Sequence, residues 1–377
     1  MSTIYNYIQE LFTQRLPFVP SNVKASLYII LFCSIAFIEL YIYIGSRRIK
    51  QWFEARRDKK FREKITNMLA NIVVYDDDIE TEEIVNHFIP KFKKLPLKSS
   101  PIRNLLVKEM LHYHLNFTGK TADVLKGLYL GLGLNKQAKK KLKGRWETQI
   151  EGIREITQMY LQEEADTILT FTNNENSQVR MEAQIAFVKL SSNNPFRFLD
   201  NVRERILDWH QLVLFEVITK TKNITIPPFS PWLTSENGSV VMLCLKLINH
   251  YQQLDAIPEL IELLRHPNLQ IRRKTINILG NLEAEMAEED LFNIYFEQPL
   301  EIRLEIIKTM GKIASGNYLE FLTGRTFSDE FKIRMEAMYS LKLHGVKGIE
   351  ILNAINNDTN SKNQSIIKHV LDERIIA

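Results

Sequence analysis

The sequence predicts an all-α protein: a solenoid of stacked helix pairs preceded by one N-terminal transmembrane helix. Three observations favour this fold class. Residues 25–45 form an apolar stretch long enough to span a membrane. A pattern of about 31 residues recurs through the C-terminal half of the chain. Glycine and proline number only 14 and 12 in 377 residues, fewer turn residues than a β-rich chain needs.

The apolar stretch reads ASLYIILFCSIAFIELYIYIG and contains a single charged residue, Glu39. At about 1.5 Å per residue, a helix of this length extends about 31 Å, close to the thickness of a bilayer's hydrocarbon core. A core helix of a soluble protein would show a polar face, which this stretch lacks. A cleaved signal peptide is disfavoured, because 24 residues precede the stretch and no small-residue cleavage site follows it.

The charges that flank the stretch predict its orientation. Residues 46–64 carry nine Lys and Arg against three acids, whereas Arg15 and Lys24 stand on the other side. The positive-inside rule therefore places residues 46–64 in the cytoplasm and residues 1–24 outside as a short stub. We interpret the basic segment as a topology determinant and a contact for lipid headgroups. Its assigned residues are Arg47, Arg48, Lys50, Arg56, Arg57, Lys59 and Lys60.

Glu39 has two readings. An ionisable group within an apolar span often marks a helix–helix contact in the membrane, and Cys33 is a second residue that could face such a partner. Alternatively, Glu39 lies about six residues from the cytoplasmic end and reaches the interface. The other cysteine is Cys244, so the sequence offers no disulfide framework.

Four segments of the C-terminal half share one pattern: a polar lead-in, an aliphatic residue, an arginine, and a helix of apolar period. They are residues 176–190, 268–282, 299–313 and 330–344. Their aliphatic residues are Val179, Ile271, Ile302 and Ile333. Steps of 30 or 31 residues add copies at Val240 and Trp209, and looser copies precede them around Ile150 and Ile102.

Short amphipathic stretches of helical period lie between these copies, at residues 255–266, 288–298, 317–326 and 348–357. Each unit is therefore predicted to be a first helix, a tight turn and a second helix, and stacking of the units buries a continuous core. We expect the solenoid to cover residues 146–377 and a helical N-terminal or capping region to cover residues 65–145.

The arginine of the pattern recurs at the first turn of the second helix, as Arg180, Arg272, Arg303 and Arg334. A cation at a helix N-terminus opposes the helix dipole unless it has a partner. We expect a repeated structural hydrogen bond to an acid or a turn carbonyl of a neighbouring unit. His210 and Val241 fall in the same slot by counting, so a shared catalytic role is excluded.

The unit resembles the HEAT repeat in its short bacterial form, over residues 145–357. The chain resembles more closely still a group of bacterial (Bacteroidota-type) proteins with an N-terminal membrane helix followed by a HEAT-repeat domain. Residues 142–159, 176–190 and 231–248, and the Phe198-Leu-Asp200 motif with Trp209, carry this likeness. The resemblance implies a non-enzymatic scaffold in the bacterial inner membrane, with the repeat domain cytoplasmic. It also suggests an envelope glycosyltransferase as partner.

A basic run occupies residues 136–145 and lacks acids. It is either a solvated helix face or a patch for an acidic partner or anionic lipid; no aromatic pattern accompanies it, which disfavours nucleic acid. Its cations are Lys136, Lys139, Lys140, Lys141, Lys143 and Arg145.

The remaining motifs do not predict a metal, phosphate or catalytic site. His112 and His114 lie two apart on a helix and point in opposite directions, so they cannot share a metal. The glycines of residues 127–133 follow no strand and predict a helix end and turn. Asp76–Asp78 are expected to cap the next helix. We therefore expect no catalytic residues, cofactor or metal.

The function predicted is that of a membrane-tethered scaffold that binds proteins through the second helices, without a small-molecule substrate or nucleic acid. The alternative is a regulatory subunit of an envelope polysaccharide complex that docks through the membrane helix. An enzyme would need His and carboxylate ligands on one face, and eight histidines are scattered along this chain.

Overall fold

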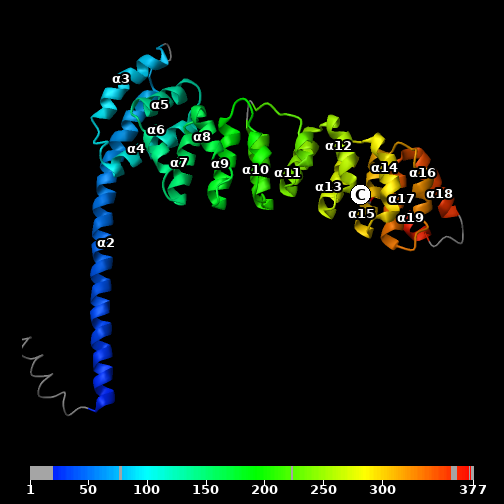
Figure 1. Cartoon of the computed structure of the whole chain (residues 1–377), viewed down its shortest axis with the longest axis horizontal. Coiled ribbons are helices and arrows are strands. Elements are labelled where there is room, and N and C mark those ends of the chain that lie inside the picture. Colours follow the sequence, from blue (N-terminus) through cyan, green and yellow to red (C-terminus); the bar gives the residue numbers. More distant parts are fainter. Residues whose placement is uncertain (1–19, 76–78, 222–223, 358–362, 373, 375–377) are drawn as a thin grey trace, which may run out of the picture. The chain divides into compact units, whose positions relative to one another are not determined.

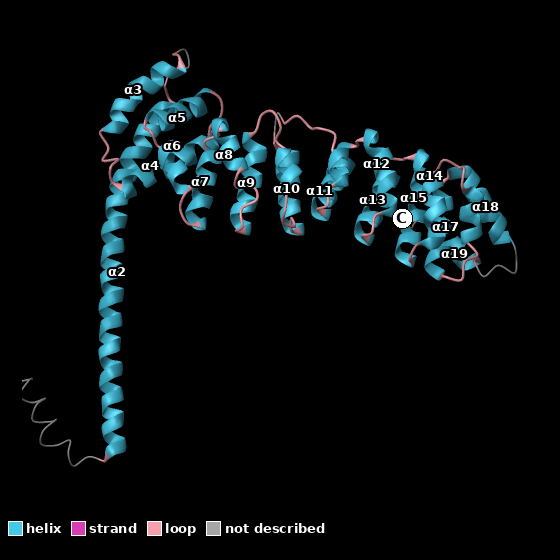
Figure 2. Ribbon diagram, in the orientation of Figure 1, coloured by secondary structure: helices cyan, strands magenta, loops and turns pink. Residues whose placement is uncertain are grey.

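The computed structural model describes residues 20–75, 79–221, 224–357, 363–372 and 374 and shows an all-α protein (Figures 1 and 2). Those residues contain no β-strand. They pack as two compact units, Met1–Leu134 and Asn135–Ala377. The predicted fold class is confirmed, since helices repeat in stacked pairs and one long apolar N-terminal helix is a candidate membrane span. Asp76–Asp78 lie outside the described residues.

The first unit is built around a single long helix. Its described helices are α2 (Ser21–Val73), α3 (Thr81–Lys93), α4 (Ser100–Asn116) and α5 (Lys120–Gly131). Helix α2 has 53 residues, about 80 Å at 1.5 Å per residue, and includes both the apolar stretch and the basic segment without a break. The apolar window is not buried against any described part of the chain. Only the last turns of α2 are packed, with Ile65 and Leu69 fully buried beside α4 and α5.

Two glycines of α5 allow α3 to approach closely. A Cβ atom on Gly127 would lie 2.8 Å from Val85 Cγ2, and one on Gly131 would lie 2.5 Å from Ile89 Cδ1. Gly133 follows with φ +69°, in the left-handed region that glycine adopts at little cost. These glycines therefore serve helix packing and a helix end, as the lack of a preceding strand predicts.

The second unit is a solenoid of first and second helices (Figure 1). Its second helices form a continuous row, each packed on the next. They are α7 (Trp146–Gln158), α9 (Ser177–Leu190), α10 (Asp208–Lys220), α11 (Gly238–Tyr251), α13 (Leu269–Asn281), α15 (Leu300–Ile313), α17 (Phe331–Leu343) and α19 (Gln364–Leu371). The first helices are α6 (Asn135–Lys141), α8 (Ala165–Leu169), α12 (Ile257–Glu262), α14 (Glu288–Ile294), α16 (Leu319–Arg325) and α18 (Gly345–Asn357).

The third residue of each main second helix points into the core. Val179, Val240, Ile271 and Ile302 are at most 2% exposed there, which explains why an aliphatic residue recurs. The copy expected at Trp209 is wrong by one residue: α10 begins at Asp208, so its third residue is His210, which is buried, while Trp209 is 56% exposed. An apolar side chain at Trp209 mimics the pattern, but the helix start sets the register.

Asparagine side chains fix three of these helix starts. Asn176 Oδ1 accepts hydrogen bonds from the backbone N–H groups of Gln178 and Val179, at 2.9 and 3.2 Å. Asn268 caps α13 in the same way, and Asn237 Oδ1 accepts from the backbone N–H of Ser239 at the start of α11. Such caps satisfy N–H groups that the helix itself leaves unpaired. The polar lead-in of the repeat is therefore a capping position.

A glycine–hydroxyl contact joins the last main second helices. A Cβ atom on Gly311 of α15 would lie 2.7 Å from the Cα atom of Ser340 on α17. The Ser340 hydroxyl donates to the carbonyl of Ile307 at 2.8 Å. One repeat earlier, Gly280 faces Thr309, whose hydroxyl donates to the carbonyl of Ile276 at 3.0 Å. Small residues thus let adjacent helices approach until a hydroxyl reaches a backbone carbonyl.

Candidate functional site

The pairing of helices is interrupted in the middle of the solenoid. No first α-helix stands between α9 and α10 or between α10 and α11 among the described residues there. Short 3₁₀ turns replace them, η4 (Arg197–Asn201) and η5 (Ser230–Thr234), joined by extended loops. Pro195, Pro227 and Pro228 lie in these loops, and proline disfavours a continuous helix. The interruption leaves the N-terminal ends of α10 and α11 uncovered.

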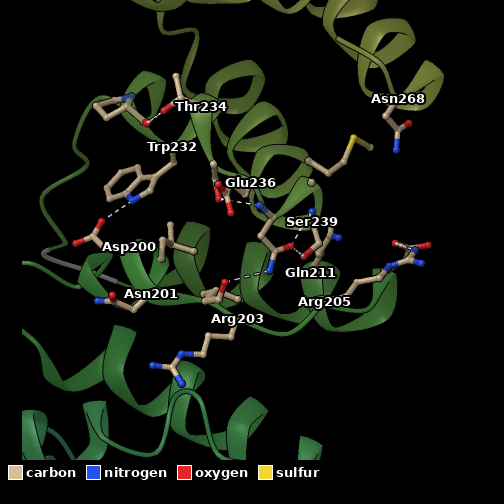
Figure 3. A pocket seen from close by; sticks show the side chains of 18 of the residues that line it. Asp200, Asn201, Arg203, Arg205, Gln211, Trp232, Thr234, Glu236, Ser239 and Asn268 are labelled. Carbon is tan, nitrogen blue, oxygen red and sulfur yellow. Dashed lines mark hydrogen bonds and ion pairs between the residues drawn. The ribbon is translucent and has the colours of Figure 1, made fainter.

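A cleft of about 1290 Å³ opens at this interruption (Figure 3). One wall is the loop from Leu199 to Arg205, and the opposite wall is η5 with the residues that follow it. Gln211, Ser239 and Met242 line it from α10 and α11, and the start of α13 adds Asn268 and Gln270. The volume exceeds the usual 300–1,000 Å³ of a small-molecule pocket, and an open cleft of this size suits a segment of polypeptide.

Hydrogen bonds hold the loop wall in place from both neighbouring repeats. Asn237 Nδ2 donates to the carbonyls of Val202 and Glu204, at 3.2 and 3.1 Å. From the preceding repeat, Asn173 Nδ2 donates to the carbonyl of Asn201 at 2.6 Å. Across the cleft, Trp232 Nε1 donates to Asp200 Oδ1 at 2.7 Å. The cleft is therefore preorganised, which lowers the ordering cost of binding.

The lining is polar and of mixed charge. Arg203, Arg205, Thr234 and Glu236 are exposed, and Arg205 approaches Asp208 at 3.7 Å. Because cations and carboxylates both face the cleft, its lining favours a polar chain with hydrogen-bonding groups over a strongly charged ligand.

Beside the cleft, α10 exposes large apolar side chains. Leu207, Trp209 and Leu212 are 48%, 56% and 65% exposed. An exposed aromatic residue with aliphatic neighbours is typical of protein-binding surfaces. Trp209, noted from the sequence as a core position, is thus a surface residue on the second-helix face.

The recurring arginines lie where the preceding turn meets the second helix. Arg180 Nη1 donates to the carbonyls of Asn174 and Glu175, at 2.5 and 3.3 Å. Arg334 Nη1 donates to those of Ser328 and Asp329, at 2.8 and 2.9 Å. These carbonyls belong to the turn of the same unit, not to a neighbouring unit as expected.

The other members of this slot differ in their surroundings. Arg272 lines a shallow cleft with Arg265 and Glu297, and Arg303 lies close enough to Tyr295 to act on its pKa. In α10 the slot holds Gln211, not His210, and its amide donates to the carbonyl of Ile206 at 3.0 Å. Arg103 of α4 makes the same type of contact, to Leu97, and the sequence reading did not include it.

His210 occupies the aliphatic slot of α10 and is 7% exposed. Burial, reinforced by the positive charge of Arg180, lowers its pKa from 6.5 to about 4. A base whose pKa is lower in the folded state than in the unfolded state stabilises the fold at high pH, and that contribution is lost as pH falls from about 6.5 toward 4. His210 therefore makes this repeat sensitive to acid.

We expect the His210→Ile variant, which matches the neighbouring repeats, to keep about 3 kcal/mol of stability that the native chain loses between pH 6.5 and 4. Thermal unfolding followed by circular dichroism over this pH range measures the difference. His250→Gln, at an exposed histidine of α11, is the control and should lose stability as the native chain does. An equal loss in the His210→Ile variant would show that His210 is not the acid-sensitive group.

The basic run of residues 136–145 is partly neutralised within the solenoid. Lys139 pairs with Glu164, Lys141 with Glu155 at 2.9 Å, and Arg145 with Glu147 at 3.0 Å. Lys136, Lys140 and Lys143 are exposed. Glu164 and Glu155 come from helical segments further along the chain, so the charges within residues 136–145 alone did not indicate these ion pairs.

In the candidate membrane span, Glu39 and Cys33 are exposed along α2. Arg47 contacts the ring and hydroxyl of Tyr43, and Arg56 lies over the ring of Trp52, 5.4 Å from its centroid. The remaining assigned cations are Arg48, Lys50, Arg57, Lys59 and Lys60. In the described part of the chain, no group of three His, Cys, Asp or Glu side chains is arranged to hold a metal ion.

The helix pairs and the cleft define the class: an all-α helical-repeat protein whose repeats are interrupted by a preorganised polar cleft. No family model and no curated protein matches the sequence. Among solved structures, the chain is similar to an engineered protein from the Northeast Structural Genomics Consortium, with a TM-score of 0.32, 13% identity, and coverage of 55% of this chain and 95% of that one.

A second similar structure is the complex of CpcE and CpcF of phycocyanin lyase from Nostoc sp. PCC7120. The TM-score is 0.26 at 14% identity, with coverage of 63% of this chain and 85% of that chain. At such values neither likeness adds to what the helices themselves show.

Proposed function

We propose that this chain is a membrane-tethered, non-enzymatic scaffold that binds protein partners through its second-helix face and the adjoining cleft. The observation that carries the proposal is the cleft itself. Its walls are fixed by hydrogen bonds from Asn173 and Asn237, while the charged side chains of its lining, Arg203, Arg205 and Glu236, are exposed. Helical solenoids offer extended surfaces of this kind to other proteins.

The tether in this proposal is the apolar part of α2, in the bacterial inner membrane with residues 46–377 in the cytoplasm. Because α2 is continuous, it also acts as a stalk. With Gly45 at the edge of the hydrocarbon, Arg47, Arg48 and Lys50 lie within about 8 Å of it, at the depth of the headgroups. Arg56 to Lys60 stand about 17–22 Å away along the helix axis, beyond the headgroups when α2 runs along the membrane normal. The first group is therefore the one that sets topology and contacts lipid.

The second candidate function is a regulatory subunit of an envelope polysaccharide or glycosyltransferase complex, docked through the membrane helix. Glu39 favours it, because a carboxylate inside an apolar span is costly without a partner. In that case Glu39 and Cys33 face the partner's membrane helix.

Exchange of residues 25–45 for an unrelated membrane helix separates the two functions. We expect affinity purification from detergent, after crosslinking in cells, to recover the same partners from the native chain and the exchange variant, because binding lies in the solenoid. Glu39→Gln in the native helix is the matched control. Loss of the partners in the exchange variant alone would favour docking through the membrane helix.

A further inference from the structure

The second-helix face carries a row of lysines across α11, α13 and α15. We call it the lysine ladder: Lys246, Lys274, Lys308 and Lys312. Lys274 lies near enough to lower the pKa of both Lys246 and Lys312, in addition to the effect of their burial, and Lys308 adds to it at Lys312. The four ammonium groups therefore lie along one face, with the carboxylates of Asp208 and Glu305 also near it.

The carboxylates of Asp208, Glu305 and Glu336 lie near this surface and offset part of its charge. Lys274 and Lys308 have no hydrogen bond or ion pair with any described residue. The nearby carboxylate of Glu305 is already bound by Arg273 at 3.4 Å and by Asn277 at 2.8 Å. At Glu336, burial raises the pKa of the carboxyl, and the nearby Lys308 lowers it. Repulsion among the lysines is therefore relieved best by an external anion.

Amide groups are placed beside the lysines. Asn281 Nδ2 donates to Asn249 Oδ1 at 2.8 Å, and Lys312 Nζ donates to Asn281 Oδ1 at 2.7 Å. These bonds link α11, α13 and α15 along the same face. Side-chain amides can both donate to and accept from a peptide backbone, so the face offers groups for a polypeptide as well as charge for an anion.

The spacing of the helices suggests the form of that polypeptide. Packed helices lie about 8–10 Å apart, and a chain in the polyproline II conformation advances about 3.1 Å per residue with three residues per turn. Such a chain, crossing α11, α13 and α15, therefore turns every third side chain toward the helices, about 9 Å apart. Anionic lipid and nucleic acid also carry negative charge, and the vesicle and oligonucleotide arms of the test below separate them from a polypeptide.

We propose that the lysine ladder binds an extended, acidic segment of a partner protein, with carboxylates at about every third residue. This inference rests on the proposed scaffold function and names the chemistry of its partner. Met242, one turn before Lys246 on α11, adds a flexible apolar side chain that suits adaptable contacts with such a segment.

The test uses the full chain in detergent and fluorescent 15-residue peptides with glutamate at every third position. We expect binding that weakens about 5- to 10-fold in the Lys274→Gln/Lys308→Gln variant and with added salt. Lys189→Gln/Lys347→Gln removes the same charge from exposed lysines of α9 and α18, and should weaken binding less than about 2-fold. A peptide with glutamine in place of glutamate should not bind.

Equal weakening in both double variants, or none in either, would overturn the proposal. So would a preference of the ladder for anionic vesicles or a single-stranded oligonucleotide over the peptide. Partner capture in cells separates failure of this proposal from failure of the scaffold function. If the Lys274→Gln/Lys308→Gln variant still captures its partners at the native level, the scaffold function stands and only the acidic-segment proposal is overturned.

Discussion

The Gly311→Ala variant should be less stable than the native chain by about 2 kcal/mol. The added methyl carbon would lie 2.7 Å from the Cα, Cβ and Oγ atoms of Ser340, so α15 and α17 must separate. Separation weakens their packing and the 2.8 Å hydrogen bond from Ser340 to Ile307. This loss exceeds the gain of about 1 kcal/mol that alanine brings to a helix. The midpoint of thermal unfolding, measured on the full chain in detergent, should fall by about 4–8 °C.

Gly324→Ala is the matched control. Gly324 lies in α16 and has no atom within 4 Å of the position of its Cβ, so the same substitution should be neutral or stabilise by up to about 1 kcal/mol. A loss of stability in Gly311→Ala together with no loss in Gly324→Ala would indicate close helix packing at Gly311. A Gly311→Ala variant as stable as the native chain would refute the glycine–hydroxyl contact as a determinant of the stack.

Deletion of residues 1–45 should move the chain from the carbonate-resistant membrane fraction to the soluble fraction. The apolar window of α2 is not buried by any described residue, and insertion of an apolar helix of spanning length is effectively irreversible. The remaining basic helix can hold the chain to anionic lipid only by charge, which high salt or carbonate removes.

The control for this deletion is replacement of residues 25–45 by an unrelated membrane helix, which should restore the membrane fraction. A deleted chain that still resisted carbonate extraction would contradict the assignment of α2 as the anchor. Circular dichroism of the soluble product should keep its helical signal, since the solenoid core lies in residues 135–377.

Much of the fold follows from the sequence because its signals are local. An aliphatic residue at the third helical position and a capping asparagine, as at Val179 and Asn176, predict where a second helix begins. The prediction for α10 was wrong because Trp209 matches the apolar residue of the pattern. The helix begins at Asp208, which places His210 in the core. Counting along a sequence cannot detect a shift of one residue in a helix start.

The candidate sites are less predictable because they join distant residues. The cleft arises where two first helices are absent, and the prolines of residues 195–231 are the signal that could have indicated it. The lysine ladder combines Lys246, Lys274 and Lys308 from three helices, which no local pattern of the sequence joins. Similarly, the charge of the run at residues 136–145 is reduced by Glu155 and Glu164, which are distant in sequence.

The most direct test of the membrane-tethered scaffold is photo-crosslinking in cells from single positions of the full chain. A photoreactive residue at Asn201, exposed in the cleft, is compared with one at Glu350, exposed on α18. We predict a covalent adduct with a membrane-associated protein from Asn201 and none from Glu350. Absence of any protein adduct from Asn201, or equal adducts from both positions, would contradict the claim that the cleft and the adjoining second-helix face bind partners.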